Sequence, residues 1–233
     1  MPRSNIYGGR DPRELPAYSI TDAARYLHVP SATLRSWFVG RTYPRQQGVG
    51  SFRRLITPAD EATPRVSFFN VVEAHVLRAL RTEHGVPIRA VRPALDYAES
   101  ELGMRHVLLS QELSTGAGEL FLDHYGELIN LSKSGQLAMR RVLEAYLRRV
   151  ERDDRHIPIR LYPFLSPRSD AGARSIVIDP QVSFGRPVVA GSGITTETLV
   201  RRIDAGEQVA DLARDYGLSR EQIEDAVVFE KAA

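Results

Sequence analysis

The sequence predicts a mainly α-helical fold with an α+β segment in the middle of the chain. Apolar residues recur at helical spacing near both ends, and short runs typical of β-strands lie between them. A run with the composition of a linker, Ser166–Ser175, precedes the last part of the chain. We therefore predict three segments, residues 1–104, 105–172 and 173–233, of which the first and the last are helical domains.

The first segment contains four predicted helices and one irregular stretch. The helices are expected at Thr21–Leu27, Ser31–Phe38, Phe68–His84 and Pro87–Leu102, where apolar residues fall three or four positions apart. Residues 41–65 separate the second helix from the third and are rich in Pro, Gly and Asp, which favours turns. Within this stretch the run SFRRLIT is the candidate for strands.

The middle segment changes to runs with the character of short strands. HVLLSQEL, GELFLD and ELINLS are expected to be strands, with a turn at residues 124–126 between the last two. A helix is predicted at Gly135–Arg152, and the extended run IPIRLYPFL follows it. These elements predict an α+β arrangement for residues 105–172.

The third segment is predicted to open with a β-hairpin and to continue in helices from Thr196. The strands are expected at Ile176–Ile178 and Pro187–Ala190. The loop GRPVVAGSGI is rich in glycine, but Ile194 stands where a Walker loop carries lysine, and Thr196 stands where a dinucleotide fingerprint has its third glycine. The loop therefore favours a hairpin that leads into a helix over a nucleotide site.

The two helical ends share one spacing of apolar residues. The intervals between successive members are 3, 4, 2 and 5 residues in both sets. This spacing suits two short helices joined by a tight turn, which is a helix-turn-helix unit. In the second unit, Ser219 and Gln222 form a predicted capping box. The sets are Ile20, Ala23, Leu27, Val29 and Leu34 in the first unit, and Val209, Leu212, Tyr216, Leu218 and Ile223 in the second.

Charge is distributed unevenly along a chain whose net charge is +2. Residues 1–105 hold 15 Lys/Arg against 10 Asp/Glu, whereas residues 175–233 hold 6 against 10. A basic end is expected of a nucleic-acid reader, and an acidic end is a poor partner for phosphate. The chain has no cysteine and no run long enough to span a membrane, which predicts a cytoplasmic protein.

The second helix of each predicted unit exposes different chemistry. SATLRSWFVGR offers hydroxyls and guanidinium groups that suit phosphates and base edges. SREQIEDAVVFE offers carboxylates, which would meet a polyanion unfavourably. We therefore expect DNA contact from the first unit and protein contact from the second, although a merely solvated acidic face remains an alternative.

The run YSITDAARYLHVPSATLRSWF resembles the start of the MerR-like winged helix-turn-helix family, in which Thr-Leu-Arg is followed by an aromatic residue, here Thr33 to Trp37. The resemblance implies a DNA-binding domain with an arginine-rich wing, for which Gly50–Arg54 is the best match. Two departures are the insertion Tyr43–Gly50 and the lack of a long dimerising helix. The predicted DNA-binding residues are Ser31, Thr33, Arg35, Ser36, Arg41, Arg45, Arg53 and Arg54.

The third segment resembles a small bacterial domain of unknown function that often accompanies antitoxins of PIN-like ribonucleases. The matching positions are Ile176, Asp179, Pro180, Gly185, Arg186, Pro187, Val188, Gly191, Ile194, Gly206, Tyr216, Leu218 and Ser219. Together the two domains resemble VapB-like antitoxins. That resemblance implies a protein that binds operator DNA, represses its own operon and neutralises a PIN-like nuclease toxin. A homodimer is expected, because operators are commonly palindromic. The predicted partner-binding residues are Arg186, Glu221, Glu224 and Asp225.

An alternative is a ligand-responsive MerR-like transcriptional regulator whose α+β segment is an effector domain. It predicts an apolar pocket lined by Phe121, Tyr125, Tyr146 and Tyr162. An enzyme is not expected, because the sequence contains no complete catalytic motif. The histidines have no metal-binding spacing, so neither a metal nor another cofactor is predicted.

Overall fold

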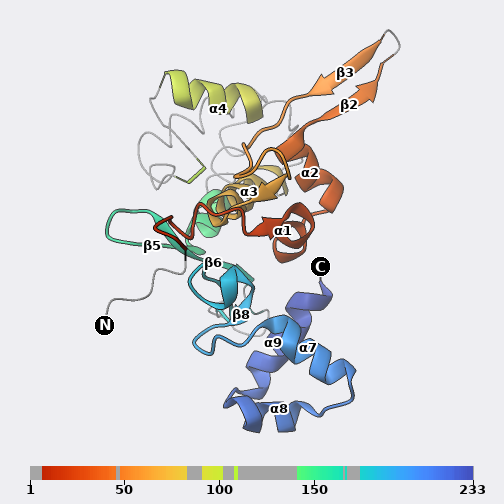
Figure 1. Cartoon of the computed structure of the whole chain (residues 1–233), viewed down its shortest axis with the longest axis vertical. Coiled ribbons are helices and arrows are strands. Elements are labelled where there is room, and N and C mark those ends of the chain that lie inside the picture. The colour runs from red at the N-terminus through yellow and green to blue at the C-terminus, as the bar shows by residue number, and fades with distance from the viewer. Residues whose placement is uncertain are drawn as a thin grey trace.

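The computed structural model describes residues 7–45, 48–82, 91–101, 108–109, 141–164, 166 and 174–232. Figure 1 shows a helical unit with a projecting β-ribbon at one end, a small sheet in the middle and a helical unit at the other end. The helices are α1 (Ile20–Tyr26), α2 (Ser31–Val39), α3 (Phe68–Thr82), α4 (Val91–Ser100), α7 (Thr196–Asp204), α8 (Val209–Tyr216) and α9 (Arg220–Lys231). The strands are β1 (Tyr18–Ser19), β2 (Arg41–Pro44), β3 (Val49–Phe52), β4 (Arg65–Val66), β5 (Val150–Arg152), β6 (Pro158–Phe164), β7 (Ile176–Ile178) and β8 (Val188–Val189).

Helices α1 and α2 form the first helix-turn-helix, within one residue of the predicted bounds. Ser19 caps α1 by accepting a hydrogen bond from the backbone N–H of Asp22 at 3.0 Å. The turn passes through His28 in the left-handed conformation, with φ of 50°, and α2 begins after Pro30. Gly40 ends α2 with φ of 78°, and its absent side chain leaves room for the carbonyl of Phe52, 2.5 Å from where a Cβ would lie.

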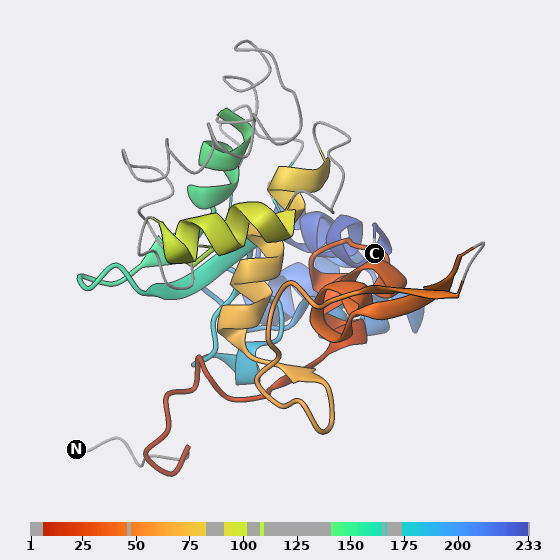
Figure 2. The same cartoon turned by 90° about the horizontal axis from the view of Figure 1, so that it is seen from above.

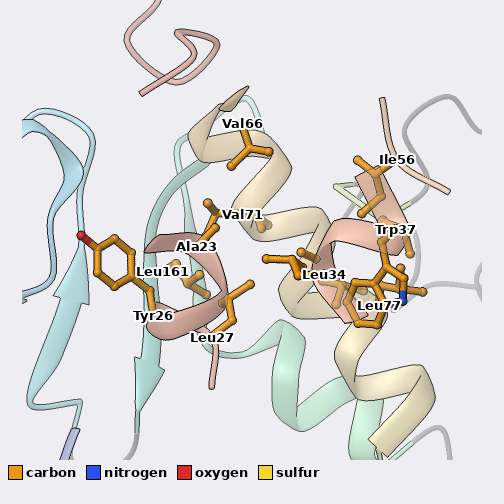
Figure 3. Packing of buried hydrophobic residues seen from close by; sticks show 14 of the residues in the cluster. Ala23, Tyr26, Leu27, Leu34, Trp37, Ile56, Val66, Val71, Leu77 and Leu161 are labelled. Carbon is orange, nitrogen blue, oxygen red and sulfur yellow. The ribbon is translucent and has the colours of Figure 1, made fainter. Parts of the chain in front are cut away.

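The largest core lies between this unit, α3 and the strand β6. Ala23, Leu27 and Leu34 are all fully buried there, as the shared spacing predicts. Figure 3 shows Leu27 of α1 and Leu34 of α2 directed toward α3, while Tyr26 of α1 points the other way. Burial of these apolar side chains stabilises the unit and fixes the angle at which α2 leaves the core.

Strands β5, β6, β7 and β8 form one antiparallel sheet in that order. Leu161 of β6 pairs with Val150 on one side and with Ile178 on the other. The sheet therefore joins residues from both sides of the predicted boundary at 172/173. Its last two strands, β7 and β8, occupy the positions predicted for strands in the third segment.

One helix prediction is wrong at its end. Helix was expected through Arg152, but residues 141–147 are helical and Val150–Arg152 form β5. Val150 is buried and pairs with Leu161, so cross-strand pairing with β6 replaces the helical turn that the local sequence favours.

Helices α7, α8 and α9 surround a second core, and α8 and α9 form the second helix-turn-helix. Gly217 ends α8 in the left-handed conformation, and Ser219 begins α9 with the predicted capping box, which is confirmed. Leu212, Leu218 and Ile223 are buried, as the shared spacing predicts.

The C-terminal end of α9 lies beside the α1–α2 unit (Figure 1). Nε2 of His28 is 2.9 Å from the carbonyl oxygen of Phe229, and the two rings lie 5.0 Å apart. Arg25 forms an ion pair of 3.2 Å with Glu230, whose side chain is 9% exposed. These contacts join the first and last units although about two hundred residues separate them in sequence.

Several predictions fall outside the described residues. They are the two strands expected at residues 118–123 and 127–132, the turn at 124–126, the first part of the helix expected from Gly135, and Phe121 and Tyr125 of the alternative pocket. Of the strand expected at residues 106–113, only Leu108 and Leu109 are described, and they form a turn.

Candidate nucleic-acid interface

Helix α2 presents one solvent-facing side that carries hydroxyls and a guanidinium group. Ser31 and Arg35 are exposed, and Thr33 and Ser36 are half-buried. The Ser36 hydroxyl donates a hydrogen bond of 2.7 Å to the carbonyl of Thr33, so its proton is used within the helix. Arg35 forms no ion pair with any residue that the structure describes, which leaves its five donors available to an external anion.

The antiparallel β2–β3 ribbon extends well beyond the body of the molecule in both views (Figures 1 and 2). Arg41, Tyr43 and Arg45 are alternate residues along its first strand and the loop that follows. Arg45 lies over the Tyr43 ring at 5.3 Å and donates a hydrogen bond of 2.9 Å to its hydroxyl, and Arg41 lies 6.0 Å from the same ring. We name these three residues the Arg–Tyr–Arg row.

Gly50 on the opposite strand makes this row sterically feasible. A Cβ at Gly50 would lie 2.6 Å from Nε of Arg45 and 2.7 Å from the Tyr43 ring. A ring that stacks against a guanidinium group holds it in place while its N–H groups stay exposed. The row therefore presents two ordered positive charges on a projecting ribbon.

The two arginines predicted for the wing follow β3 and differ in their surroundings. Arg53 is exposed and has no ion-pair partner among the described residues. Arg54 donates to both carboxylate oxygens of Glu61, at 2.7 and 3.1 Å, and this hydrogen bonding lowers the pKa of Glu61. Arg54 is thus neutralised within the chain, whereas Arg53 is available to a ligand.

The predicted partner-binding residues also separate into two groups. Arg186 and Glu221 are exposed, and Glu224 accepts a hydrogen bond of 2.7 Å from Arg220. Asp225 is only 3% exposed and accepts hydrogen bonds from the hydroxyls of Ser166 at 2.9 Å and Ser175 at 2.5 Å. Asp225 is therefore removed from the predicted partner surface, because its carboxylate is buried and satisfied inside the chain.

Comparison with known proteins matches both helical ends of the chain to families. Residues 16–95 match a family described as "Putative DNA-binding HTH domain", and residues 176–229 match the protein family of unknown function DUF433. The chain is 32% identical to a protein named "Putative antitoxin VapB45" from Mycobacterium tuberculosis, over 92% of this chain and 93% of that protein. The chain belongs to the VapB45 family.

Two further proteins of Mycobacterium tuberculosis resemble this VapB45-family chain along most of its length. The uncharacterized protein Rv2308 is 29% identical over 94% of this chain and 91% of its own. The crystal structure of Rv2018 superposes with a TM-score of 0.65 at 28% identity, covering 91% of this chain and 97% of that chain. The expected resemblance to VapB-like antitoxins is confirmed, while a specifically MerR-like wing stays a prediction.

Two of the four residues predicted to line an effector pocket, Tyr146 and Tyr162, lie in the described part of this VapB45-family chain. Tyr146 is buried, with its ring 4.9 Å from the His75 ring. The hydroxyl of Tyr162 donates a hydrogen bond of 2.9 Å to Glu151, and Arg174 covers its ring at 4.9 Å. These two tyrosines are thus engaged by neighbouring side chains, and Phe121 and Tyr125 lie outside the described residues.

No group of three or more metal-ligating side chains occurs within the described ranges. None of the helices described is long and apolar enough to cross a membrane.

Two features of the VapB45-family chain are missing from the sequence prediction. The sequence predicts Tyr43 as part of an irregular insertion, although its alternation with Arg41 and Arg45 is a signal for one face of a strand. The contact between His28 and Phe229 joins residues 201 positions apart, and no local pattern indicates it.

Proposed function

We propose that this protein is an antitoxin and autorepressor that binds operator DNA through α2 and the β2–β3 ribbon. The observation that carries the proposal is the set of exposed arginines on these elements, none of which forms an ion pair with a described carboxylate. Arginine in this state can bind phosphates or guanine edges. The set comprises Arg35, Arg41, Arg45 and Arg53.

The second helix-turn-helix is less suited to a DNA groove. The first residues of a recognition helix meet the base edges, and in α9 these include Glu221 and Glu224, the second of which is paired with Arg220. Glu230 at its end is engaged by Arg25. The exposed charged side chains of α9 are Arg220, Glu221 and Lys231. Glu221 would repel phosphate, and the charge of Arg220 is offset by its ion pair with Glu224.

We further propose that the operator is bound by a homodimer. One α2 helix reads only a few base pairs, and a two-fold pair of helices doubles the contacts on a palindromic site. A footprint on the promoter should then show two protected half-sites about 10 base pairs apart, or a multiple of that spacing.

The DNA-binding proposal is tested by the affinity of the full chain for its own promoter. Fluorescence anisotropy at 150 mM salt should show the promoter duplex bound at least about 1,000-fold more tightly than a scrambled duplex of the same composition. Equal affinity for the two duplexes would contradict operator recognition.

The proposal also assigns neutralisation of a PIN-like nuclease toxin to the surface outside α2 and the ribbon. The protein contributes binding rather than catalysis. Its test is co-expression of the full chain with the PIN-like nuclease encoded beside it, where growth should be restored. The full-length protein is used because a chain truncated at Ser175 would lose β7 and β8, which belong to the same sheet as β6. Continued growth arrest with both proteins present at normal levels would refute neutralisation.

A further inference from the structure

Phe184 is the large aromatic side chain that the described surface exposes most openly. It is 71% exposed and lies in a short 3-10 turn, Ser183–Gly185, between β7 and β8. Aromatic side chains normally bury most of their surface, and one that does not is a candidate for contact with another molecule.

The backbone under Phe184 adopts a conformation that side chains disfavour. Ser183 and Phe184 have φ values of 48° and 55°, in the left-handed region. Two consecutive residues other than glycine in this region are strained, and such strain concentrates at functional positions. Burial of Phe184 does not compensate the strain, since the side chain lies in solvent.

Contacts on both sides hold the strained turn in place. The Ser183 hydroxyl donates a hydrogen bond of 2.9 Å to the carbonyl of Gly193, and the Gly185 N–H donates one of 2.9 Å to Val182. Gly185 is packed against Tyr18, whose hydroxyl lies 2.0 Å from the place a Cβ would take. The turn is therefore fixed against both the glycine loop and the first unit, and Phe184 is presented in an ordered position.

We propose that Phe184 is an anchor residue that inserts into an apolar pocket of the cognate nuclease toxin. This inference rests on the proposed antitoxin function and names the site through which the toxin is held. An anchor that is ordered before binding loses little conformational freedom on association, which favours affinity. Arg186 is exposed two residues later and has no ion-pair partner in the described part of the chain, so the pocket should carry a carboxylate at its rim.

DNA and a second copy of the chain fit this site less well. The β2–β3 ribbon lies on the far side of α1 and α2 from β8 (Figure 1), so the turn before β8 is not part of the surface proposed to bind DNA. A two-fold dimer contact would have to offer the ring an apolar receptor within the same patch, and Gln181, Ser183 and Arg186 around the turn are polar. A different protein with a concave surface is the occupant that this shape favours.

The test compares two variants of Phe184 with a matched control, using the full chain and the purified PIN-like nuclease encoded beside it. Phe184→Ala should weaken nuclease binding by about 30-fold or more, as expected for a hot-spot residue. Phe184→Gly should weaken binding equally and raise the unfolding midpoint, because glycine accepts a positive φ without strain. Val49→Ala removes a side chain that is 76% exposed on the ribbon and should leave nuclease binding unchanged.

The outcomes separate this proposal from the function on which it rests. If the wild-type chain does not bind the nuclease, the antitoxin function fails, and the anchor fails with it. If the wild type binds and both Phe184 variants bind as tightly, the anchor is refuted while the function stands. If Phe184→Ala instead abolishes self-association in sedimentation and leaves nuclease binding intact, the site is a dimer contact and the proposal is overturned. Retained promoter binding shows that each Phe184 variant is folded, and circular dichroism checks the folding of Val49→Ala.

Discussion

The two helix-turn-helix units, α1–α2 and α8–α9, turn through the same left-handed conformation with different residues. Gly217 adopts it in the second unit with φ of 63°, and glycine does so without strain. His28 adopts it in the first unit with φ of 50°. Its imidazole contacts Phe229, so the turn that precedes α2 is stabilised by the far end of the chain.

The second helices of the two units differ still more. Helix α2 has no side-chain cap and leaves Arg35 open to solvent. Helix α9 has a complete capping box, encloses Asp225 and pairs Glu224 with Arg220. The shared apolar spacing thus determines the fold of each unit, whereas the exposed side chains determine which unit can bind DNA.

The largest expected effect tests whether the two cores are equivalent. Leu34 and Ile223 occupy the last position of the shared spacing, and both are fully buried. Leu34→Ala and Ile223→Ala should each lower the free energy of unfolding by about 2–5 kcal/mol, since each leaves a cavity. Urea unfolding followed by circular dichroism measures both values. A loss under about 1 kcal/mol, the average for a substitution, in one variant alone would break the equivalence.

Lowering the pH should destabilise the first unit more than the second, and this effect is expected to be smaller than that of the core substitutions. Burial lowers the pKa of His75 from 6.5 to about 3 and also lowers the pKa of His28, while residues 175–233 contain no histidine. The unfolded chain therefore binds protons that the folded chain does not. The contribution of these histidines to the free energy of unfolding is fully present above pH 6.5 and is lost as the pH drops below that value. His75 alone should account for a loss of about 2 kcal/mol between pH 6.5 and pH 5.

Trp37 is the single tryptophan and lies buried in the first unit, so its fluorescence reports this loss. His75→Gln keeps a donor for the Tyr146 carbonyl but does not titrate, so it should flatten most of the pH dependence. If the unfolding midpoint of the wild type, followed by Trp37 fluorescence, is the same at pH 7 and pH 5, His75 does not cause the predicted loss of stability.

The smallest effect concerns the helix starts. Ser219→Ala removes the cap of α9 and should cost about 1 kcal/mol of unfolding free energy. Pro30→Ala at the equivalent position of α2 removes no side-chain hydrogen bond and should cost less. Thermal unfolding of the two variants compares these costs, and a larger loss from Pro30→Ala would reverse the expected order.

Local signals explain what the sequence predicted well. Periodicity and the Ser219–Gln222 capping box act within a few residues, so the bounds of α1, α2 and the start of α9 follow from short stretches. The strand at Val150 depends instead on pairing with Leu161. The burial of Asp225 depends on two serines 59 and 50 residues away, which no local pattern contains.

The candidate DNA-binding site also combines features set by short stretches of sequence with features set by long-range contacts. Arg35 and Arg53 were predicted from a short motif, and both are exposed. The pairing of Arg54 with Glu61 was not predicted, because it depends on how the chain folds back after β3. The stack of Arg45 on Tyr43 depends on the room that Gly50 leaves across the ribbon, which is a property of strand register.

The salt dependence of promoter binding tests most directly that the first unit, and not the second, binds DNA. Arg35→Ala with Arg53→Ala is compared with Arg214→Ala and Arg220→Ala, which remove two exposed arginines from α8 and α9. The first pair should reduce the slope of log K against log salt by about one to two, since each lost phosphate contact contributes about 0.9. The second pair should leave the slope unchanged. A slope that falls with the second pair and not with the first would contradict the account.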